Sequence, residues 1–275
     1  MVKVFEGTKN EYYMDGYMVQ NLDTAKKVIK DDWDMIFVYD GNEGSGKSVK
    51  AMQDAFYCDP TFNLDRVVFT PEDLKEAIIK SKPYQSLVFD EGYRGLSSRA
   101  AMSMINKTLV KMLAEIRQKN LFVFVVLPSI FDLDKYVAIW RSRALIHIYT
   151  GKNFQRGFFS FYNSERKKQL YVLGKKYYSY GKPKANFIGR FTNHYVLDEK
   201  EYRKKKKESL ANIEKKPDKV EERELENKMF DRVMKMPDDV PHVVKMKLLN
   251  MHKATYFRKK KKYELGSGYD VEFDV

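Results

Sequence analysis

The sequence predicts an α/β protein with a parallel sheet covered by helices on both faces, and three observations lead to this prediction. Short apolar runs of strand length alternate with stretches of helical periodicity between residues 22 and 150. A glycine-rich turn joins one of these runs to the helix that follows it. Beyond about residue 200, the apolar runs give way to charged sequence. Strands that alternate with helices favour βα crossovers, which bury both faces of a parallel sheet.

The first half of the expected core contains three strands. The run "DMIFVYD" is apolar and stops at Gly41, which is typical of a buried strand before a turn. In "TPEDLKEAIIK", Thr70 suits a helix N-cap and Pro71 suits the first helical position. The elements expected here are, in order, a helix over 22–32, a strand over 34–40, a helix over 47–57, a strand over 66–69, a helix over 70–80 and the strand "SLVFD" that ends at Asp90.

The second half of the expected core continues this alternation. Apolar residues recur at three- and four-residue steps from Met102 to Ile116, which predicts a helix with one buried face. The expected elements are a helix over 99–119, a strand over 121–127, a helical stretch over 132–142 and a strand over 144–150. After Gly151, "RGFFSFY" and "QLYVLG", separated by the polar "NSERKK", predict a two-stranded antiparallel extension of the sheet.

The change in composition near residue 200 predicts two domains. We expect an α/β domain over 1–200 and a basic, helical C-terminal region over 201–275, with a linker near 215–219. The formal net charge of +13 and the pI near 9.4 indicate anionic partners. A hydrophobic content of 43% is sufficient for a folded core.

The number of cysteines and the lengths of the apolar runs indicate the cellular compartment of the protein. The single cysteine, Cys58, excludes an internal disulfide and fits a reducing environment. The longest apolar run, "LFVFVVLPSIF", is too short to cross a bilayer. The four histidines show no metal-ligand spacing, so no metal site made by side chains alone is expected. We therefore expect a cytoplasmic protein without a membrane span, located in the host cytoplasm if the chain is viral.

The segment "VYDGNEGSGKS" fits the pattern G-x-x-x-x-G-K-[ST] and lies between an expected strand and an expected helix. Glycines allow a tight turn that brings main-chain N–H groups to phosphate oxygens, and the helix dipole adds to this attraction. Lys47 is expected to reach the β- and γ-phosphates, and the Ser48 hydroxyl is expected to ligate Mg²⁺. The expected nucleotide-binding residues are Gly41, Asn42, Glu43, Gly44, Ser45, Gly46, Lys47, Ser48 and Val49.

Two acidic residues, Asp90 and Glu91, close the apolar strand "SLVF". In a parallel sheet they emerge at the same carboxyl edge as the glycine-rich turn. Asp90 is expected to hold Mg²⁺ through water, and Glu91 is expected to orient and deprotonate the attacking water. Together these residues resemble the Walker A and Walker B motifs of P-loop ATPases. The resemblance implies a P-loop NTPase αβα sandwich and Mg²⁺-dependent hydrolysis, and the lack of an N-K-x-D motif favours ATP over GTP.

The stretch "LAEIRQKNLFVFVVLPSIFDLDKYVAIWRSRALIHIY" resembles a segment of the FtsK/HerA superfamily of DNA-pumping ATPases. The resemblance covers about residues 33–150. It implies that Arg117 ends a helix and that Ser129 lies near a sensor position where the family usually has glutamine. It also implies that Arg141 or Arg143 is an arginine finger supplied to a neighbouring subunit of a homo-oligomeric ring. Relatives with this architecture include viral packaging ATPases, plasmid-transfer motors and zonula occludens toxin-like phage proteins.

Taken together, the residues and the resemblance predict an ATP-hydrolysing DNA motor. Such a motor would be a translocase, packaging or transfer ATPase of a virus, plasmid or other mobile element, with a portal, capsid or transfer-complex protein as a partner. Two alternatives stay open. One is an ATP-dependent DNA-binding switch such as a replication initiator, loader or regulator, and the other is an assembly or secretion ATPase that moves a phage protein.

The basic C-terminal region predicts contact with DNA. The sequence "RKKKK" occurs at 203–207 and at 258–262, and such clusters bind phosphate backbones by counterion release, independently of base sequence. The segments on either side of Asn250 are consistent with a helix-turn-helix in which Tyr256 and Arg258 face DNA. An amphipathic helical pair that packs on the ATPase domain or on a partner is the alternative.

Overall fold

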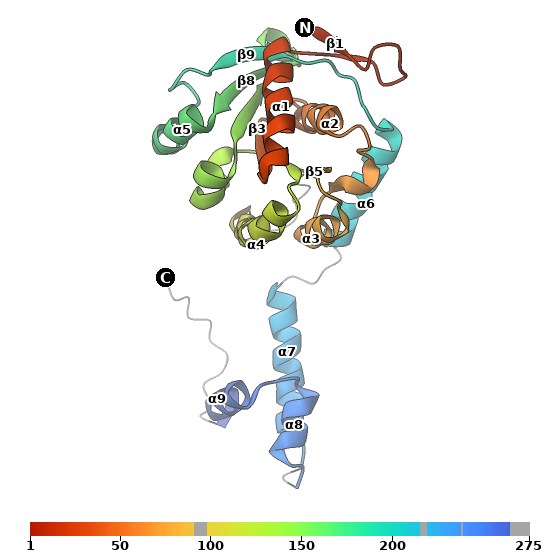
Figure 1. Cartoon of the computed structure of the whole chain (residues 1–275). Coiled ribbons are helices and arrows are strands. Elements are labelled where there is room, and N and C mark those ends of the chain that lie inside the picture. Colours follow the sequence, from red (N-terminus) through yellow and green to blue (C-terminus); the bar gives the residue numbers. More distant parts are fainter. Residues whose placement is uncertain (91–97, 215–218, 238, 265–275) are drawn as a thin grey trace. The chain divides into compact units, whose positions relative to one another are not determined.

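The computed structural model describes residues 1–90, 98–214, 219–237 and 239–264 (Figure 1). The chain divides into two compact units, Met1–Ile213 and Glu214–Val275. The division therefore falls at the end of helix α6 (Glu199–Glu214), whereas the sequence analysis set the boundary at 200/201. The reason is that Tyr202 of α6 is buried in the core of the first unit. Most of the linker expected near 215–219 lies outside the described residues.

The first unit is built around a seven-stranded sheet with the order β4-β5-β6-β3-β7-β8-β9. The five strands from β4 to β7 in this order are parallel, as the alternating pattern predicts. Strands β8 and β9 extend the sheet in antiparallel orientation, and β8 confirms the strand predicted in "RGFFSFY". The strands are β3 (Met35–Gly41), β4 (Val67–Val68), β5 (Ser86–Asp90), β6 (Phe122–Val126), β7 (Ala144–Tyr149), β8 (Phe158–Asn163) and β9 (Phe187–Arg190).

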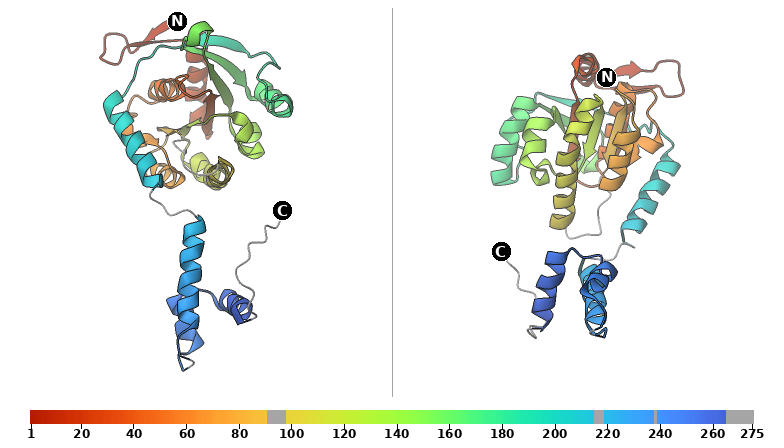
Figure 2. Two further views of the ribbon diagram at one scale, coloured as in Figure 1. Left: turned by 180° about the vertical axis from the view of Figure 1, so that it is seen from behind. Right: turned by 60° about the horizontal axis from the view of Figure 1, so that its bottom comes forward.

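Helices cover both faces of this sheet (Figure 1, Figure 2). Along β3, Phe37 and Tyr39 pack in one apolar core with α1 and α2, while Ile36 and Val38 pack in a second core with α3, α4 and α5. The first unit is therefore the αβα sandwich of the P-loop type that the sequence predicts. The helices are α1 (Gly16–Val28), α2 (Lys47–Cys58), α3 (Pro71–Lys80), α4 (Ser98–Gln118) and α5 (Ser164–Tyr177).

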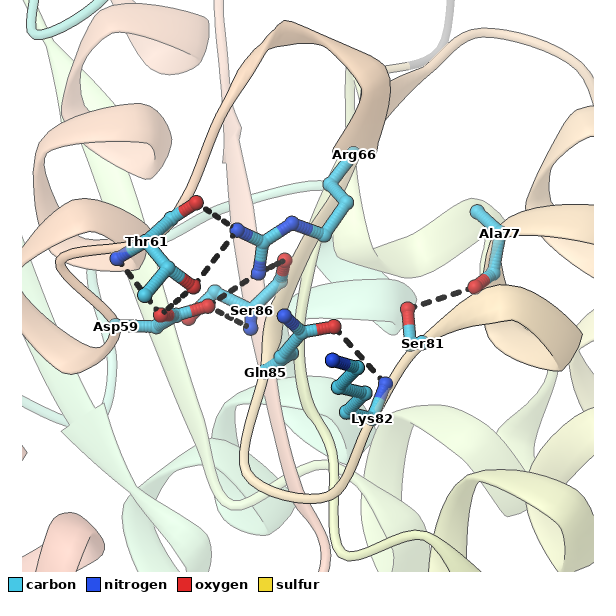
Figure 3. Close-up of polar contacts among 8 residues, drawn as sticks. All are labelled: Asp59, Thr61, Arg66, Ala77, Ser81, Lys82, Gln85 and Ser86. Carbon is cyan, nitrogen blue, oxygen red and sulfur yellow. Dashed lines mark hydrogen bonds and ion pairs between the residues drawn. The ribbon is translucent and has the colours of Figure 1, made fainter.

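The connection between α2 and β5 is held by a buried carboxylate (Figure 3). Asp59, the C-cap of α2, accepts a hydrogen bond from the main-chain N–H of Ser86 at 2.9 Å. It also accepts from the Thr61 hydroxyl at 2.6 Å and forms an ion pair with Arg66. Because the opposite ends of α2 and β5 carry the candidate site residues, this anchor fixes the two elements relative to each other.

A hairpin that the sequence analysis did not predict precedes α1. Its strands, β1 (Val2–Val4) and β2 (Tyr12–Met14), pair antiparallel. The hydroxyl of Tyr12 donates to the carbonyl oxygen of Gln53 in α2 at 2.7 Å. Helix α1 begins at Gly16 rather than at residue 22 because Asp15 caps its first turn.

The segment "QLYVLG" is part of helix α5, so the prediction of a strand there is wrong. Asn163 caps α5 by accepting from the main-chain N–H of Arg166 at 3.0 Å. Leu170 and Tyr171 then lie on the buried side of the helix. The polar "NSERKK" thus starts a helix, and the second antiparallel strand is β9. A six-residue apolar run fits both the helical and the strand period, and only its packing decides between them.

The helical stretch expected over 132–142 is a 3-10 turn, Ile130–Asp132, followed by a π-helix, Tyr136–Arg141. Lys167 of α5 supports the C-terminal end of this π-helix. Its ammonium donates to the carbonyl oxygens of Ala138 and Ser142, both at 2.6 Å. Further 3-10 turns occupy Ile29–Asp31, Leu64–Arg66 and Lys152–Phe154.

The described part of the second unit contains three helices, α7 (Lys219–Met234), α8 (His242–Leu248) and α9 (Lys253–Glu264). Tyr256 of α9 has no exposed surface; its ring centroid lies 6.2 Å from that of Phe230, and its hydroxyl lies 3.0 Å from His242 Nδ1. The prediction that Tyr256 faces DNA is therefore wrong, because the ring fills the core of this unit. Arg258 is exposed. Within the described residues, no helix combines the length and the apolar character needed to cross a bilayer.

Candidate functional site

The glycine-rich loop lies between the last residue of β3 and the first residue of α2, where the sequence predicts it. Gly41 has φ 132°, and a Cβ there would stand 1.9 Å from the carbonyl oxygen of Ile148. Gly46, the N-cap of α2, has φ 101° and provides no side chain that caps the helix. The first main-chain N–H groups of α2 are therefore left to an outside acceptor, which is the arrangement that binds phosphate.

Lys47 folds back over this loop. Its ammonium donates to the carbonyl oxygens of Gly41 at 2.5 Å and Asn42 at 2.9 Å. Burial lowers the pKa of Lys47, and the positive charge of Lys206 acts in the same direction, while Asp40 and Asp90 oppose the shift. The ammonium of Lys47 thus lies at the mouth of the loop, close enough to two carboxylates and a second ammonium to be influenced by their charges.

Asp90 ends β5 at the same edge of the sheet as the loop. Asp90 and Tyr39 are both in register with Val126 of the strand between them, so Asp90 lies level with Tyr39, two residues before the end of β3. The Asp90 side chain is buried, and its Oδ2 accepts from the Tyr202 hydroxyl at 2.5 Å and from Lys206 Nζ at 2.9 Å. Glu91, the expected general base, lies outside the described residues.

Tyr202 links the two residues expected at the metal. Besides donating to Asp90, its hydroxyl interacts with Ser48. Burial raises the pKa of Tyr202 far above its usual value, and the charge of Asp90 raises it further. The hydroxyl therefore stays protonated and acts as a donor toward Asp90.

These residues surround one cavity of about 620 Å³. It joins the loop, the end of β6, the segment after β9 and one face of α6. Five of its lining residues are cationic and two, Glu43 and Asp90, are acidic, which suits a polyanionic ligand. The lining residues are Glu43, Gly44, Gly46, Lys47, Ser48, Val49, Asp90, Val126, Leu127, Pro128, Arg156, Asn193, Tyr195, Tyr202, Arg203, Lys206 and Lys207.

Part of this site comes from outside the two motifs and is not predicted by the sequence. Arg156 precedes β8, and Arg203, Lys206 and Lys207 belong to the first "RKKKK" run, for which the sequence predicts only a DNA contact. A signal existed, because residues three and four apart share one face of a helix and Tyr202 precedes Lys206 by four. No local pattern, however, shows that this face turns toward the glycine-rich loop.

A second polar cluster surrounds Asp40, directly before the loop. Asp40, the residue before Gly41, accepts from the Tyr180 hydroxyl at 2.5 Å and from the main-chain N–H of Ile130 at 2.9 Å, and its Oδ1 lies 2.8 Å from His147 Nδ1. The rings of His147 and Tyr180 stack with centroids 3.8 Å apart. These contacts fix the end of β3, from which the loop starts.

The structure does not bring Ser129, Arg141 or Arg143 into the cavity. Ser129 follows the lining residue Pro128, but its Oγ accepts from the main-chain N–H of Phe131 at 3.2 Å. Arg141 and Arg143 both form ion pairs with Asp34, which precedes β3 and so marks the edge of the sheet opposite the loop. An arginine finger acts on a neighbouring subunit, so the roles of the two arginines stay predictions.

Arg117 lies in the last turn of α4, at the helix end that the family resemblance implies. Its side chain is exposed. The cavity does not include it among the described lining residues, so any part in catalysis also stays a prediction.

No protein-family model and no curated protein matches the chain. Among solved structures, the chain is similar to the N-terminal domain of zonular occludens toxin from Neisseria meningitidis. The sequences are 19% identical, the TM-score is 0.36, and the match covers 62% of this chain and 98% of the other.

Proposed function

We propose that the chain is an Mg²⁺-dependent ATPase of the P-loop type. The observation that carries this proposal is the single cavity in which the uncapped start of α2, Lys47 and the buried Asp90 meet. The main-chain N–H groups of the loop and Lys47 would hold the phosphates, while the Ser48 hydroxyl and Asp90 would hold Mg²⁺. The ion would neutralise phosphate charge when bound.

The donor set supports this assignment. A hydroxyl and a carboxylate are oxygen ligands of the kind that Mg²⁺ prefers, and the excess of cationic side chains balances a triphosphate. Asp40 and its partners keep the loop in place. Glu91 is proposed as the base that deprotonates water, from its position directly after Asp90.

Nucleotide binding and turnover test this proposal. Lys47→Ala should lose ATP affinity and turnover, and Glu91→Gln should bind ATP but hydrolyse it slowly. Lys80→Ala, on the exposed face of α3, is the matched control for loss of one lysine charge. Unchanged turnover in Lys47→Ala would contradict the proposal, as would wild-type protein that does not bind ATP at any Mg²⁺ concentration.

We further propose that ATP hydrolysis serves work on DNA, carried out by a ring of identical subunits. The high net positive charge and the basic run at 258–262 support a phosphate-backbone contact. A portal, capsid or transfer-complex protein is the proposed partner. DNA should stimulate ATP turnover, and the mass of the protein in solution should increase when ATP and DNA are added. ATP turnover by a strict monomer at a rate that DNA does not change would contradict this function.

The second candidate is a DNA-binding switch, in which part of the first basic run serves the nucleotide site and not DNA. Part of the basic run in α6 is used inside the first unit, since Lys206 contacts Asp90 and Lys205 contacts the carbonyl oxygens of Leu64 and Val67. These lysines are therefore less available to DNA. A triplex-displacement assay separates the candidates, because a motor displaces the third strand and a switch binds DNA in response to ATP without displacing it.

A further inference from the structure

We propose that Lys206 binds the terminal phosphates of the nucleotide and lets the site distinguish a triphosphate from a diphosphate. The inference rests on the proposed nucleotide-binding function of the cavity. It adds a phosphate-binding residue from outside the two motifs. Lys206 lies in α6, more than a hundred residues along the chain from Asp90, with which it forms an ion pair. The ligand class is a nucleoside triphosphate.

The contacts of the Lys206 ammonium leave it able to bind a ligand. An ammonium carries three hydrogens. Among the described residues, Lys206 Nζ contacts Asp90 Oδ2 at 2.9 Å and the Tyr202 hydroxyl at 3.3 Å. Its side chain is 31% exposed and lines the cavity. Within the described residues, these contacts use two of the three hydrogens.

The position of Lys206 is fixed by its neighbours. Tyr202, one helical turn earlier, is 4% exposed and packs near Phe69 and Tyr195. Its hydroxyl and Lys206 share the same carboxylate oxygen of Asp90. A cation that is held in place before a ligand arrives loses less conformational freedom on binding, so it contributes more to affinity.

The contact of Lys206 with Asp90 points to a role at the terminal phosphates. Lys47 approaches the cavity from the glycine-rich loop, whereas Lys206 approaches it from the carboxylate that is the proposed partner of Mg²⁺. Two ammonium groups close enough to influence each other are stabilised by an anion between them. A nucleoside diphosphate lacks the terminal phosphate, so it would not make this contact.

Neighbouring lysines on α6 provide controls for this role. Lys204 is exposed, lies 4.0 Å from Glu208 and does not line the cavity. Lys205 is half-buried and donates to two main-chain carbonyl oxygens at 2.8 Å, so its role is to hold α6 on the first unit. Three consecutive lysines thus have three different environments.

The experiment compares ATP and ADP binding, each titrated as a fluorescent analogue with Mg²⁺, across single variants of the full chain. Lys206→Met should weaken ATP binding by about 10- to 100-fold, the range for one lost hydrogen bond to a charged group, with a clearly smaller loss for ADP. Lys206→Arg should restore most of the preference for ATP. Lys204→Met should leave both affinities unchanged, and Lys205→Met should lower the melting temperature without changing their ratio.

The outcomes separate failure of this inference from failure of the proposed function. Equal losses for ATP and ADP in Lys206→Met would overturn the inference, and so would an unchanged ATP affinity. Tighter ATP binding would also overturn it, because Lys206 would then compete with Mg²⁺ for Asp90. If wild-type protein binds neither nucleotide, the proposed function itself fails. The melting temperatures of all variants, measured without nucleotide, identify any that do not fold.

Discussion

Gly41 is the residue at which the site depends most directly on main-chain geometry. The strand ends there with φ 132°, and the carbonyl oxygen of Ile148 occupies the place that a Cβ would need. The close contact between Gly41 and Ile148 keeps β7 and β3 paired up to the point where the loop begins. A side chain at this position would separate the strands or displace the loop.

Gly41→Ala should therefore lower the free energy of unfolding by about 2–4 kcal/mol, since it combines an unfavourable φ with a main-chain clash. Gly7→Ala is the matched control, because Gly7 also has a positive φ but no atom lies within 4 Å of its added Cβ. It should cost only about 1 kcal/mol. Urea denaturation of both variants measures the difference, and equal losses would contradict the role of the Ile148 contact.

Lys167 shows how a buried charge makes stability depend on pH. Burial and the nearby charge of Arg143 lower its pKa to about 7 in the folded chain, from an ordinary value of 10.5. The unfolded chain then binds this proton more strongly, so stability rises as the pH increases from about 7 toward 10.5. Because the carbonyl oxygens around Lys167 also support its charged form, we expect a gain of about 1–2 kcal/mol between pH 7 and 9.

Lys167→Met separates this effect from those of other groups. The variant should be less stable at every pH, because the carbonyl oxygens of Ala138 and Ser142 lose their donor. Its stability should also rise less between pH 7 and 9 than that of the wild type. Denaturant titrations at several pH values provide the two slopes, and identical slopes would show that Lys167 titrates normally.

At the scale of elements, the sequence predicted what local periodicity determines. The strand before Gly41 and the helix capped by Thr70 were found because their residues carry the whole signal. The run "QLYVLG" was misassigned because its period is ambiguous without its packing partners. The role of α6 was missed for a related reason, since it depends on contacts with residues that are distant in sequence.

The candidate site likewise contains residues that the motifs predict and residues that only packing places. Lys47, Ser48 and Asp90 follow from motifs and do lie around one cavity. Arg156 and Lys206 could not be assigned, because their place depends on how β8 and α6 pack. The interior position of Tyr256 was also unpredictable, since an aromatic residue in a basic helix suits a core and a nucleic-acid surface equally well.

Helix α6 should be needed for the stability of the first unit, although its sequence is strongly charged. A chain that ends at Asp198 would lose Tyr202 from the core, and with it the donors to Asp90. We expect it to be about 3–5 kcal/mol less stable than a chain that ends at Ile213, comparable to removing a large buried side chain. Chemical denaturation of the two chains tests this, and equal stability would mean that α6 is only attached to the surface.

At the scale of the whole molecule, the positive charge lies in two places with different proposed uses. In the first unit, Arg156, Arg203, Lys206 and Lys207 face a cavity, where they suit a small polyanion. In the second unit, α9 carries six basic residues against one Glu, and Arg258 and Lys261 are exposed. Net charge alone cannot distinguish these uses, but substitution at matched positions can.

Under the proposed function, we expect α9 to contact DNA. The double variant Arg258→Gln/Lys261→Gln should weaken DNA binding and reduce the slope of log affinity against log salt by about 2, because each lost phosphate contact removes about one unit. Lys27→Gln/Lys30→Gln removes the same charge from exposed positions in the first unit, so it should leave that slope unchanged. Fluorescence anisotropy with a labelled duplex at several salt concentrations measures both. Equal effects would mean that DNA responds to total charge and not to α9, and ATP affinity should stay constant in both variants because neither pair lines the cavity.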